Sequence, residues 1–288
     1  MSDKPTSPAE AFRALPGHGV VTLAGPDAAR FAQAQFMGDV DPLGDGHWQW
    51  NGWLTPKGRV LALFALLRFD AAQVWLLLPD ADAGTLAADL RRLLFRSKLQ
   101  VGVADTLHVS GAFDHATTAH GARLGSGTGD VVELDMRGEG GARCLRIGAS
   151  GASPVDPAFE RAWAATDLAH GLPRLAPGAA PRWTPQQLSL ERLRAYSVRK
   201  GCYPGQEIVA RTHFLGTAKR GLVRLTGSKA LDVGAQVSQG DHDVGEIACV
   251  STDPPQALAV LQSERGDAPL HAGGVALTVA PLLDGLAR

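Results

Sequence analysis

The sequence predicts an α+β protein that ends in an antiparallel β-barrel. Before residue 219, segments with strand character alternate with amphipathic helices and short turns, an order typical of a sheet covered by helices on one side. After Lys219, short apolar segments recur about every ten residues between Gly, Asp and Pro turns, which is the pattern of a small barrel. We therefore expect two regions, residues 1–218 and residues 219–288.

The first 110 residues predict a sheet and its covering helices. Gly25-Pro26-Asp27 follows a short strand and opens a helix that carries Phe31. An apolar run of eight residues from Val60 predicts a strand that is buried on both faces, and Lys57-Gly58-Arg59 forms the turn before it. Leucines at helical spacing predict a helix over residues 85–96. We expect strands over residues 20–23, 48–54, 60–69, 74–78, 99–103 and 107–110.

The middle of the chain predicts a hairpin, a helix and a linker. Residues 121–130 form a Gly-rich loop that lacks the Gly-Lys-Ser/Thr ending of a phosphate-binding loop. Residues 131–136 and 143–147 are expected to pair as a hairpin, and residues 157–170 to form a helix that ends at Gly171. A linker rich in Pro, Gly and Ala spans 174–182, and a helical turn spans 185–194. The barrel strands are expected over 222–226, 235–237, 244–250, 257–262 and 275–279.

Composition excludes several classes of protein. The hydrophobic share of 45% and the charged share of 20% are those of a soluble globular protein, and the longest apolar run is far shorter than a membrane helix needs. The first residues lack the basic and apolar regions of a secretory signal. Cys144, Cys202 and Cys249 lie far apart in sequence and form no CxxC motif, so we expect neither a disulfide framework nor a bound metal. A reducing cytoplasm and no membrane association are the expectation.

The net charge of −1 conceals a basic zone. Residues 182–224 contain nine Lys or Arg and two acidic residues, a local charge of +7, so the rest of the chain carries −8. Such a zone indicates an anionic ligand or partner, or a solvated face whose charge is balanced by acids from elsewhere in the fold.

The densest chemistry lies in the segment Arg199-Lys200-Gly201-Cys202-Tyr203-Pro204-Gly205-Gln206-Glu207-Ile208-Val209-Ala210-Arg211, called the cysteine motif below. Neighbouring cations and a following helix N-terminus both favour the reactive thiolate form of a cysteine. Pro204 suits the first turn of a helix, and Glu207 lies four residues before Arg211 on one helix face. The alternative is a loop-to-helix junction with a buried, inert cysteine. A nucleophile–base pair between Cys202 and His213 would need help from the fold, because a helix separates them.

The run Lys-Gly-Cys-Tyr-x-Gly-Gln-Glu, followed by Val-Ala-Arg, resembles the marker of the YgfZ family. That family consists of folate-binding proteins linked to iron–sulfur enzyme maintenance and tRNA modification, and is related to the glycine-cleavage T-protein, an aminomethyltransferase. The resemblance implies a three-module cloverleaf, with two interleaved α+β modules in residues 1–218 and tetrahydrofolate or a one-carbon derivative in the central hole. It also implies iron–sulfur client enzymes as partners, tRNA-modifying ones among them.

The resemblance assigns site residues position by position. Cys202 is expected to be the functional thiol, and Trp163, whose spacing to Gly171 and Pro173 follows the family, to line the folate pocket. The second aromatic position of that pocket falls on His18, a departure from the family's tryptophan. Cations could bind the folate carboxylates, and Gln206 or Glu207 the donor edge of the pterin. The remaining expected ligand contacts are Lys57, Arg59, Lys200, Tyr203 and Arg211.

Three functions are compatible with these features. The first is an accessory protein that binds folate without turnover. The second is a folate-dependent aminomethyltransferase, whose catalytic aspartate would fall near Thr85, with Asp80 and Asp82 close by. The third, direct RNA binding through the basic zone, lacks the aromatic-rich strand motifs that read single-stranded bases. We therefore expect a folate-binding accessory protein that supports iron–sulfur enzymes and does not bind nucleic acid directly.

Overall fold

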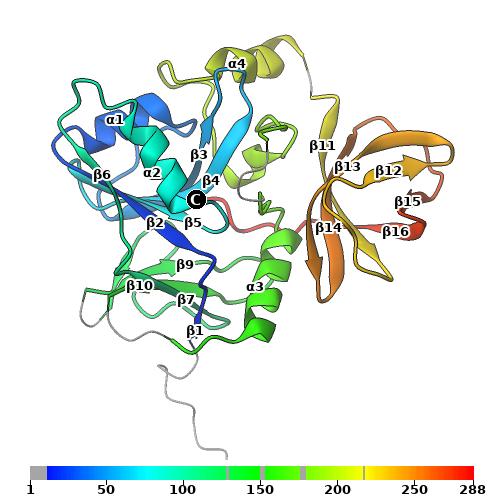
Figure 1. Ribbon diagram of the computed structural model, residues 1–288, viewed down its shortest axis with the longest axis horizontal. Coiled ribbons are helices and arrows are strands. Elements are labelled where there is room, and N and C mark those ends of the chain that lie inside the picture. The colour runs from blue at the N-terminus through cyan, green and yellow to red at the C-terminus, as the bar shows by residue number, and fades with distance from the viewer. Residues whose placement is uncertain (1–11, 128–129, 150–152, 176–179, 217) are drawn as a thin grey trace, which may run out of the picture.

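The computed structural model describes residues 12–127, 130–149, 153–175, 180–216 and 218–288, which form three lobes (Figure 1). The first lobe is a five-stranded antiparallel sheet in the order β3-β4-β5-β2-β6. Its strands are β2 (Gly19–Ala24), β3 (His47–Leu54), β4 (Val60–Arg68), β5 (Gln73–Leu78) and β6 (Gln100–Val103). Two helices, α1 (Ala28–Gln35) and α2 (Ala83–Arg91), belong to this lobe.

Strand β4 is covered on both faces, as its apolar run predicts. Phe64 and Leu66 pack with residues of α1 and α2 on one side, whereas Leu63 and Leu67 face a second core on the other side. The period of two along a strand explains this division, because neighbouring side chains point to opposite faces. The sheet is therefore the middle layer between the two helices and the second lobe.

The second lobe is another five-stranded antiparallel sheet, in the order β1-β7-β10-β9-β8. Its strands are β1 (Arg13–Ala14), β7 (His108–Ala112), β8 (Gly125–Ser126), β9 (Val132–Asp135) and β10 (Cys144–Gly148). The predicted hairpin is confirmed as β9–β10. Helix α3 (Pro157–Ala169) lies beside this sheet and reaches the third lobe, where the Gln256 side chain donates to the Ala165 carbonyl at 2.8 Å.

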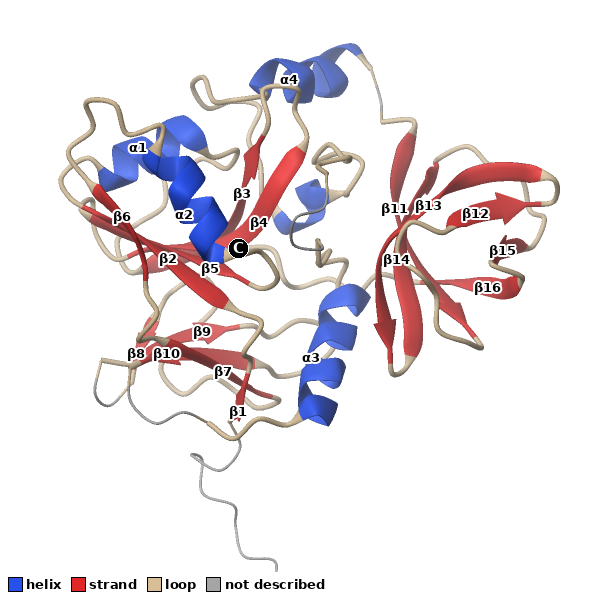
Figure 2. Cartoon of the chain, viewed as in Figure 1, coloured by secondary structure: helices blue, strands red, loops and turns tan. Residues whose placement is uncertain are grey.

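The third lobe is a closed six-stranded barrel in the order β11-β14-β13-β12-β15-β16. Its strands are β11 (Arg220–Gly227), β12 (Gln236–Gln239), β13 (His242–Thr252), β14 (Pro255–Gln262), β15 (Leu270–Ala272) and β16 (Val275–Ala280). Figure 2 shows that residues 220–280 contain no helix. The α+β class and the C-terminal antiparallel barrel are confirmed, and the three-residue β15 is the one barrel strand that the sequence did not predict.

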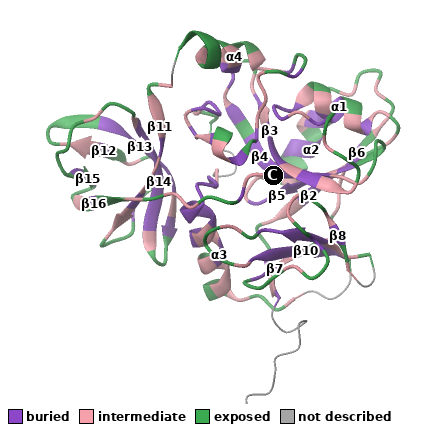
Figure 3. Ribbon diagram, turned by 180° about the vertical axis from the view of Figure 1, so that it is seen from behind, coloured by how far each residue is buried: buried purple, intermediate pink, exposed green. Residues whose placement is uncertain are grey.

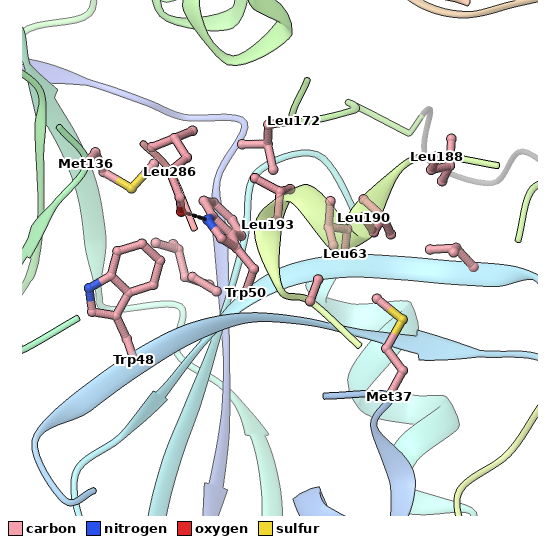
Figure 4. Close-up of a cluster of buried hydrophobic side chains, with 14 of the residues drawn as sticks. Met37, Trp48, Trp50, Leu63, Met136, Leu172, Leu188, Leu190, Leu193 and Leu286 are labelled. Carbon is pink, nitrogen blue, oxygen red and sulfur yellow. Dashed lines mark hydrogen bonds between the residues drawn. The ribbon is translucent and has the colours of Figure 1, made fainter. Parts of the chain in front are cut away.

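The chain after the barrel returns to the first lobe. The indole N–H of Trp50 donates to the Leu286 carbonyl at 2.9 Å, and Leu286 is buried in the core between the two sheets (Figure 4). Trp48 and Trp50 meet edge to face in the same core, with ring centroids 5.5 Å apart. The last residues thus connect the barrel to the N-terminal sheets.

Two helix boundaries differ from the prediction. Helix α2 ends at Arg91, and it could not have reached residue 96, because Phe95 adopts a left-handed backbone (φ 41°) that a right-handed helix cannot contain. Helix α4 (Gln206–Leu215) begins two residues after Pro204, because Gly205 is left-handed (φ 80°) and ends the preceding loop. The turn predicted over 185–194 contains a 3₁₀ helix, η2 (Leu190–Leu193). Part of the expected loop 121–130 and of the linker 174–182 lies outside the described residues.

Candidate functional site

The cysteine motif forms a loop and then helix α4, at the edge of the first lobe (Figure 1). Cys202 is exposed, so the alternative of a buried, inert cysteine is wrong. The other two cysteines are buried, and burial raises the pKa of both the Cys144 and Cys249 thiols to about 12. Cys202 is therefore the one cysteine whose sulfur is accessible to a partner molecule.

Lys200 is buried beside this exposed thiol and holds the motif against α1. Its Nζ atom donates to the backbone carbonyls of Gln33, Phe36 and Gly38 at 2.5, 2.7 and 2.9 Å. A lysine ammonium has three donors, so all of them are used. A cation also suits the C-terminal end of a helix, where carbonyl groups lack partners within the helix. In this structure Lys200 is thus directed at α1 and has no donor left for a ligand carboxylate.

Tyr203 and Gln206 shape the loop around the thiol. The buried Tyr203 donates its hydroxyl to the Ser197 carbonyl at 2.9 Å, and the Gln206 amide donates to the Lys200 carbonyl at 3.0 Å. The Lys200 ammonium also lies 5.1 Å from the centre of the Tyr203 ring. These contacts bind the loop to itself and leave Cys202 on its outer side.

Two glycines allow the motif to lie against the β3–β4 hairpin. A Cβ atom on Gly205 would lie 2.5 Å from the Thr55 carbonyl oxygen and 2.8 Å from the Cα atom of Gly58. A Cβ atom on Gly58 would lie 2.8 Å from that of Ile208. The Lys57-Gly58-Arg59 turn therefore packs against the start of α4. Lys57 is exposed there, while Arg59 donates to the Gln187 side chain at 3.0 Å.

Glu207 and Arg211 both point to solvent from α4, and no ion pair joins them in the described part of the chain. They lie one turn apart on the same face, as expected from their spacing. The structure thus brings together Cys202, Lys57, Arg59, Lys200, Tyr203, Gln206, Glu207 and Arg211 around one loop and one hairpin turn.

Trp163 lies elsewhere, on α3 in the core beside the second sheet. Only 1% of it is exposed, its ring stacks on Phe159 at 5.8 Å, and the Arg143 guanidinium lies 4.8 Å from the ring centre. The close contact between Gly111 and Trp163 shows that the indole fills space against strand β7. The structure does not bring Trp163 to the cysteine motif.

His18 lies near a buried ionic cluster. The Asp167 carboxylate is almost fully buried and accepts from Arg143 at 2.7 Å and from the Nε atom of Arg174 at 3.0 Å. Burial and the positive charge of Arg174 lower the pKa of His18 to about 3, although the nearby Asp167 opposes the shift. His18 is therefore a neutral imidazole in the pH range where cells operate.

A cavity of about 800 Å³ lies where β4, the start of α2, the segment 180–188 and barrel strand β13 meet. This volume falls within the range of small-molecule sites. Trp53 and Trp183 line it, together with apolar side chains of the first sheet and the barrel. Four acidic residues and one cation also line the cavity: Asp80, Asp82, Asp89, Glu246 and Arg182.

Asp80 is the most strongly perturbed acid of the cavity. Burial raises the pKa of its carboxyl group to about 7, against the opposing effects of Arg174 and of the Leu175 backbone N–H, which donates to it. Asp82 follows as the N-cap of α2 and accepts from the backbone of Gly84 and Thr85. Across the cavity, Arg182 forms a bidentate ion pair with Glu246, in which the Arg182 Nη2 atom lies 2.6 Å from the Glu246 Oε2 atom.

The cavity and the cysteine motif share the β3–β4 hairpin. Trp53 and Val60 face the cavity from the two strands, and the turn between them packs on Gly205. Trp53 also pairs with Phe36, whose carbonyl accepts from Lys200. No local sequence pattern distinguishes the cavity residues Trp53, Trp183, Arg182 and Glu246 from core or surface positions, so the sequence does not predict their place in the cavity.

No protein-family model matches the chain. The tRNA-modifying protein YgfZ of Vibrio vulnificus is 26% identical over 255 residues, which cover 83% of this chain and 77% of that protein. The protein of the same name from Klebsiella pneumoniae is 28% identical over 227 residues, 73% of this chain and 69% of its own. The predicted resemblance to the YgfZ family is confirmed. A Haemophilus influenzae protein, described as uncharacterized, is 25% identical over 230 residues, 78% of each chain.

The fold is that of the T-protein. The glycine cleavage system aminomethyltransferase T of Bartonella henselae matches with a TM-score of 0.69 at 15% identity, over 94% of this chain and 85% of that one. The predicted T-protein-like fold is therefore confirmed. In the described part of the chain, no helix is long and apolar enough to cross a bilayer, and no three His, Cys, Asp or Glu side chains gather as a metal site would require.

Proposed function

We propose that this chain is a folate-binding accessory protein that supports the assembly or repair of iron–sulfur enzymes, including enzymes that modify tRNA. The support comes from relatives named tRNA-modifying protein YgfZ, from the T-protein fold and from the cysteine motif. The observation that carries the proposal is the cavity of about 800 Å³, which shares a hairpin with that motif.

The residues around the cavity fit a reduced folate. A folate has a flat heterocycle with several hydrogen-bond donors, and Trp53 and Trp183 offer aromatic surface while Asp80 offers a carboxyl group. The indole N–H of Trp53 is buried and donates to no other described residue, so it is a donor beside the cavity. Arg182 is the cation that lines it. We therefore assign the aromatic walls to Trp53 and Trp183, and a core role to Trp163.

The exposed thiol of Cys202 would contact the iron–sulfur client enzyme. Its thiol is exposed, whereas a stable cluster usually takes about four cysteine ligands. A single thiol can therefore hold iron or sulfur only together with groups from the client. Tyr203, Gln206 and Lys200 hold the loop in place, so that the thiol is presented from a fixed backbone.

The test uses the chromosomal gene in its own host. Deletion should lower the content of nucleosides made by iron–sulfur tRNA-modifying enzymes, as measured by mass spectrometry of total tRNA. A Cys202→Ala variant should match the deletion, and a Cys144→Ala variant, provided that it accumulates to the normal level, should match the wild type. Unchanged nucleosides in the deletion strain would refute the accessory role, and full activity of Cys202→Ala would refute the role of the thiol.

A second candidate is a folate-dependent aminomethyltransferase, and Asp80 favours it. Burial raises the pKa of this cavity carboxyl to about 7, a value that suits an acid or base in proton transfer. The relevant assay is release of ammonia from an aminomethyl donor in the presence of tetrahydrofolate. Ammonia release by the wild type that Asp80→Asn abolishes would establish the aminomethyltransferase activity. If no ammonia is released, the accessory function is favoured.

A further inference from the structure

The basic zone of residues 182–224 divides into two sets of side chains. Four of its nine cations are engaged within the fold by acids, amides or carbonyl groups: Arg182, Arg192, Lys200 and Arg224. The other five form no ion pair in the described part of the chain: Arg194, Arg199, Arg211, Lys219 and Arg220. Within the described residues, these five side chains therefore remain available to a partner that carries negative charge.

Exposed apolar side chains lie in the last turn of α4. Phe214 is 65% exposed and Leu215 is 82% exposed, and the one ring contact of Phe214 in the described chain is with the adjacent His213. Val209 is the one fully buried residue of this helix. Figure 3 shows α4 as a largely exposed helix at the periphery of the molecule. Single exposed apolar residues are ordinary, whereas an adjacent aromatic and aliphatic pair on a projecting helix indicates contact with a partner.

Helical spacing places cation and apolar groups together. Arg211 precedes Leu215 by four residues and Phe214 by three, so the three side chains share one face of α4. Arg199 and Lys219 flank the helix in sequence, and both are exposed. From residue 195 to residue 231 the chain contains one acidic residue, Glu207.

We infer that the α4 surface, defined as Arg211, Phe214 and Leu215, is the docking surface for a protein that presents an apolar depression rimmed by carboxylates, with the exposed Arg199 and Lys219 as further cations on the segments before and after the helix. This inference rests on the proposed function, because the partner would be the iron–sulfur client. Aromatic and arginine side chains are enriched in protein interfaces, and opposite charge guides association. Docking here would bring the client to the segment that carries the exposed Cys202.

The same features argue against other macromolecules. A nucleic acid would gain from the cations and from stacking on Phe214, but the most exposed apolar side chain of the α4 surface is the aliphatic Leu215, which offers no ring on which a base could stack. A membrane-binding helix needs a continuous apolar face, and α4 exposes two adjacent large apolar residues in ten. A protein with an apolar depression rimmed by carboxylates would pair with the cations and also bury Phe214 and Leu215.

The experiment uses chromosomal variants in the natural host. Arg211→Glu and the double variant Phe214→Ser/Leu215→Ser should lower the iron–sulfur-dependent tRNA nucleosides to the level of the deletion strain. Both purified variants should unfold at the same urea concentration as the wild type, and the Phe214→Ser/Leu215→Ser variant should bind a stable reduced folate with the same affinity. Matched controls are Lys229→Glu and Val155→Ser, which alter an exposed cation and an exposed apolar residue outside the α4 surface.

A photocrosslinking amino acid at position 215 identifies what binds. We expect an adduct with a different protein, and Arg211→Glu should abolish it. Where the deletion lowers the nucleosides, wild-type levels in the α4 variants would overturn the inference. An adduct with a second copy, RNA or phospholipid would overturn it in every case. If deletion of the gene changes no nucleoside, the proposed function fails, and the adduct alone then decides whether the α4 surface docks a protein.

Discussion

Replacing Gly205 by alanine should separate the cysteine motif from the hairpin that supports it. The residue has φ of 80°, where an L-amino acid costs about 1–2 kcal/mol. Its new Cβ atom would lie 2.5 Å from the Thr55 carbonyl oxygen and 2.8 Å from the Cα atom of Gly58. Both are backbone atoms that no rotamer change can move. Shifting the hairpin adds an overpacking cost of about 1–3 kcal/mol. The whole loss of unfolding free energy is about 2–5 kcal/mol.

Gly201→Ala is the matched control in the same loop. Its backbone is not left-handed, and a Cβ atom there would meet nothing within 4 Å. We expect its unfolding free energy to stay within about 0.5 kcal/mol of the wild type. Urea unfolding, followed by circular dichroism, measures both variants. Equal midpoints for Gly205→Ala and Gly201→Ala would refute the argument that the motif depends on this backbone contact.

Three further predictions concern buried groups. Because burial raises the pKa of Asp80 to about 7 in the folded state, against 3.8 as its ordinary value, the folded protein holds a proton that the unfolded chain releases between these values. Wild-type stability should therefore fall relative to Asp80→Asn as the pH rises from 4 to 7, and urea midpoints with no pH-dependent difference would contradict this. One thiol per folded chain should react with a disulfide reagent, and none in Cys202→Ala, because Cys144 and Cys249 are buried with pKa values of about 12; two or three fast thiols would be inconsistent with the fold. Asp167→Asn should lower the free energy of unfolding by about 3–5 kcal/mol, because it leaves Arg143 buried without its carboxylate partner. Asp89→Asn breaks an exposed ion pair with Arg92 and should lower the free energy of unfolding by less than about 1 kcal/mol. Similar urea midpoints for the two variants would count against a stabilising role of the buried Arg143–Asp167 pair.

Local sequence patterns were enough to predict the fold where they reflect burial directly. The apolar run from Val60 indicates a strand covered on both sides, and β4 divides its side chains between two cores. Regular turns after Lys219 indicate the barrel. The end of α2 could not be predicted in this way, because leucine spacing continues past Arg91 while the backbone of Phe95 turns left-handed.

The candidate site was predicted only in part, because charge and aromatic content do not show what a side chain contacts. Lys200 and Arg211 are both cations of one motif, yet the first binds three carbonyl groups and the second faces solvent. Trp163 has the spacing expected of a pocket residue and is buried in a core. Trp53 and Trp183, which do line the cavity, are 130 positions apart in the chain and meet only in the folded protein.

The central claim is that the cavity between the first sheet and the barrel binds reduced folate. Leu61 lines this cavity and is 39% exposed, so Leu61→Trp fills the space without entering a core. Leu93 is equally exposed and lies away from the cavity lining, which makes Leu93→Trp the control. Titration calorimetry with a stable reduced folate should show saturable binding to the wild type and to Leu93→Trp, and at least about tenfold weaker binding to Leu61→Trp. No binding to the wild type, or equal affinity in all three proteins, would contradict the claim.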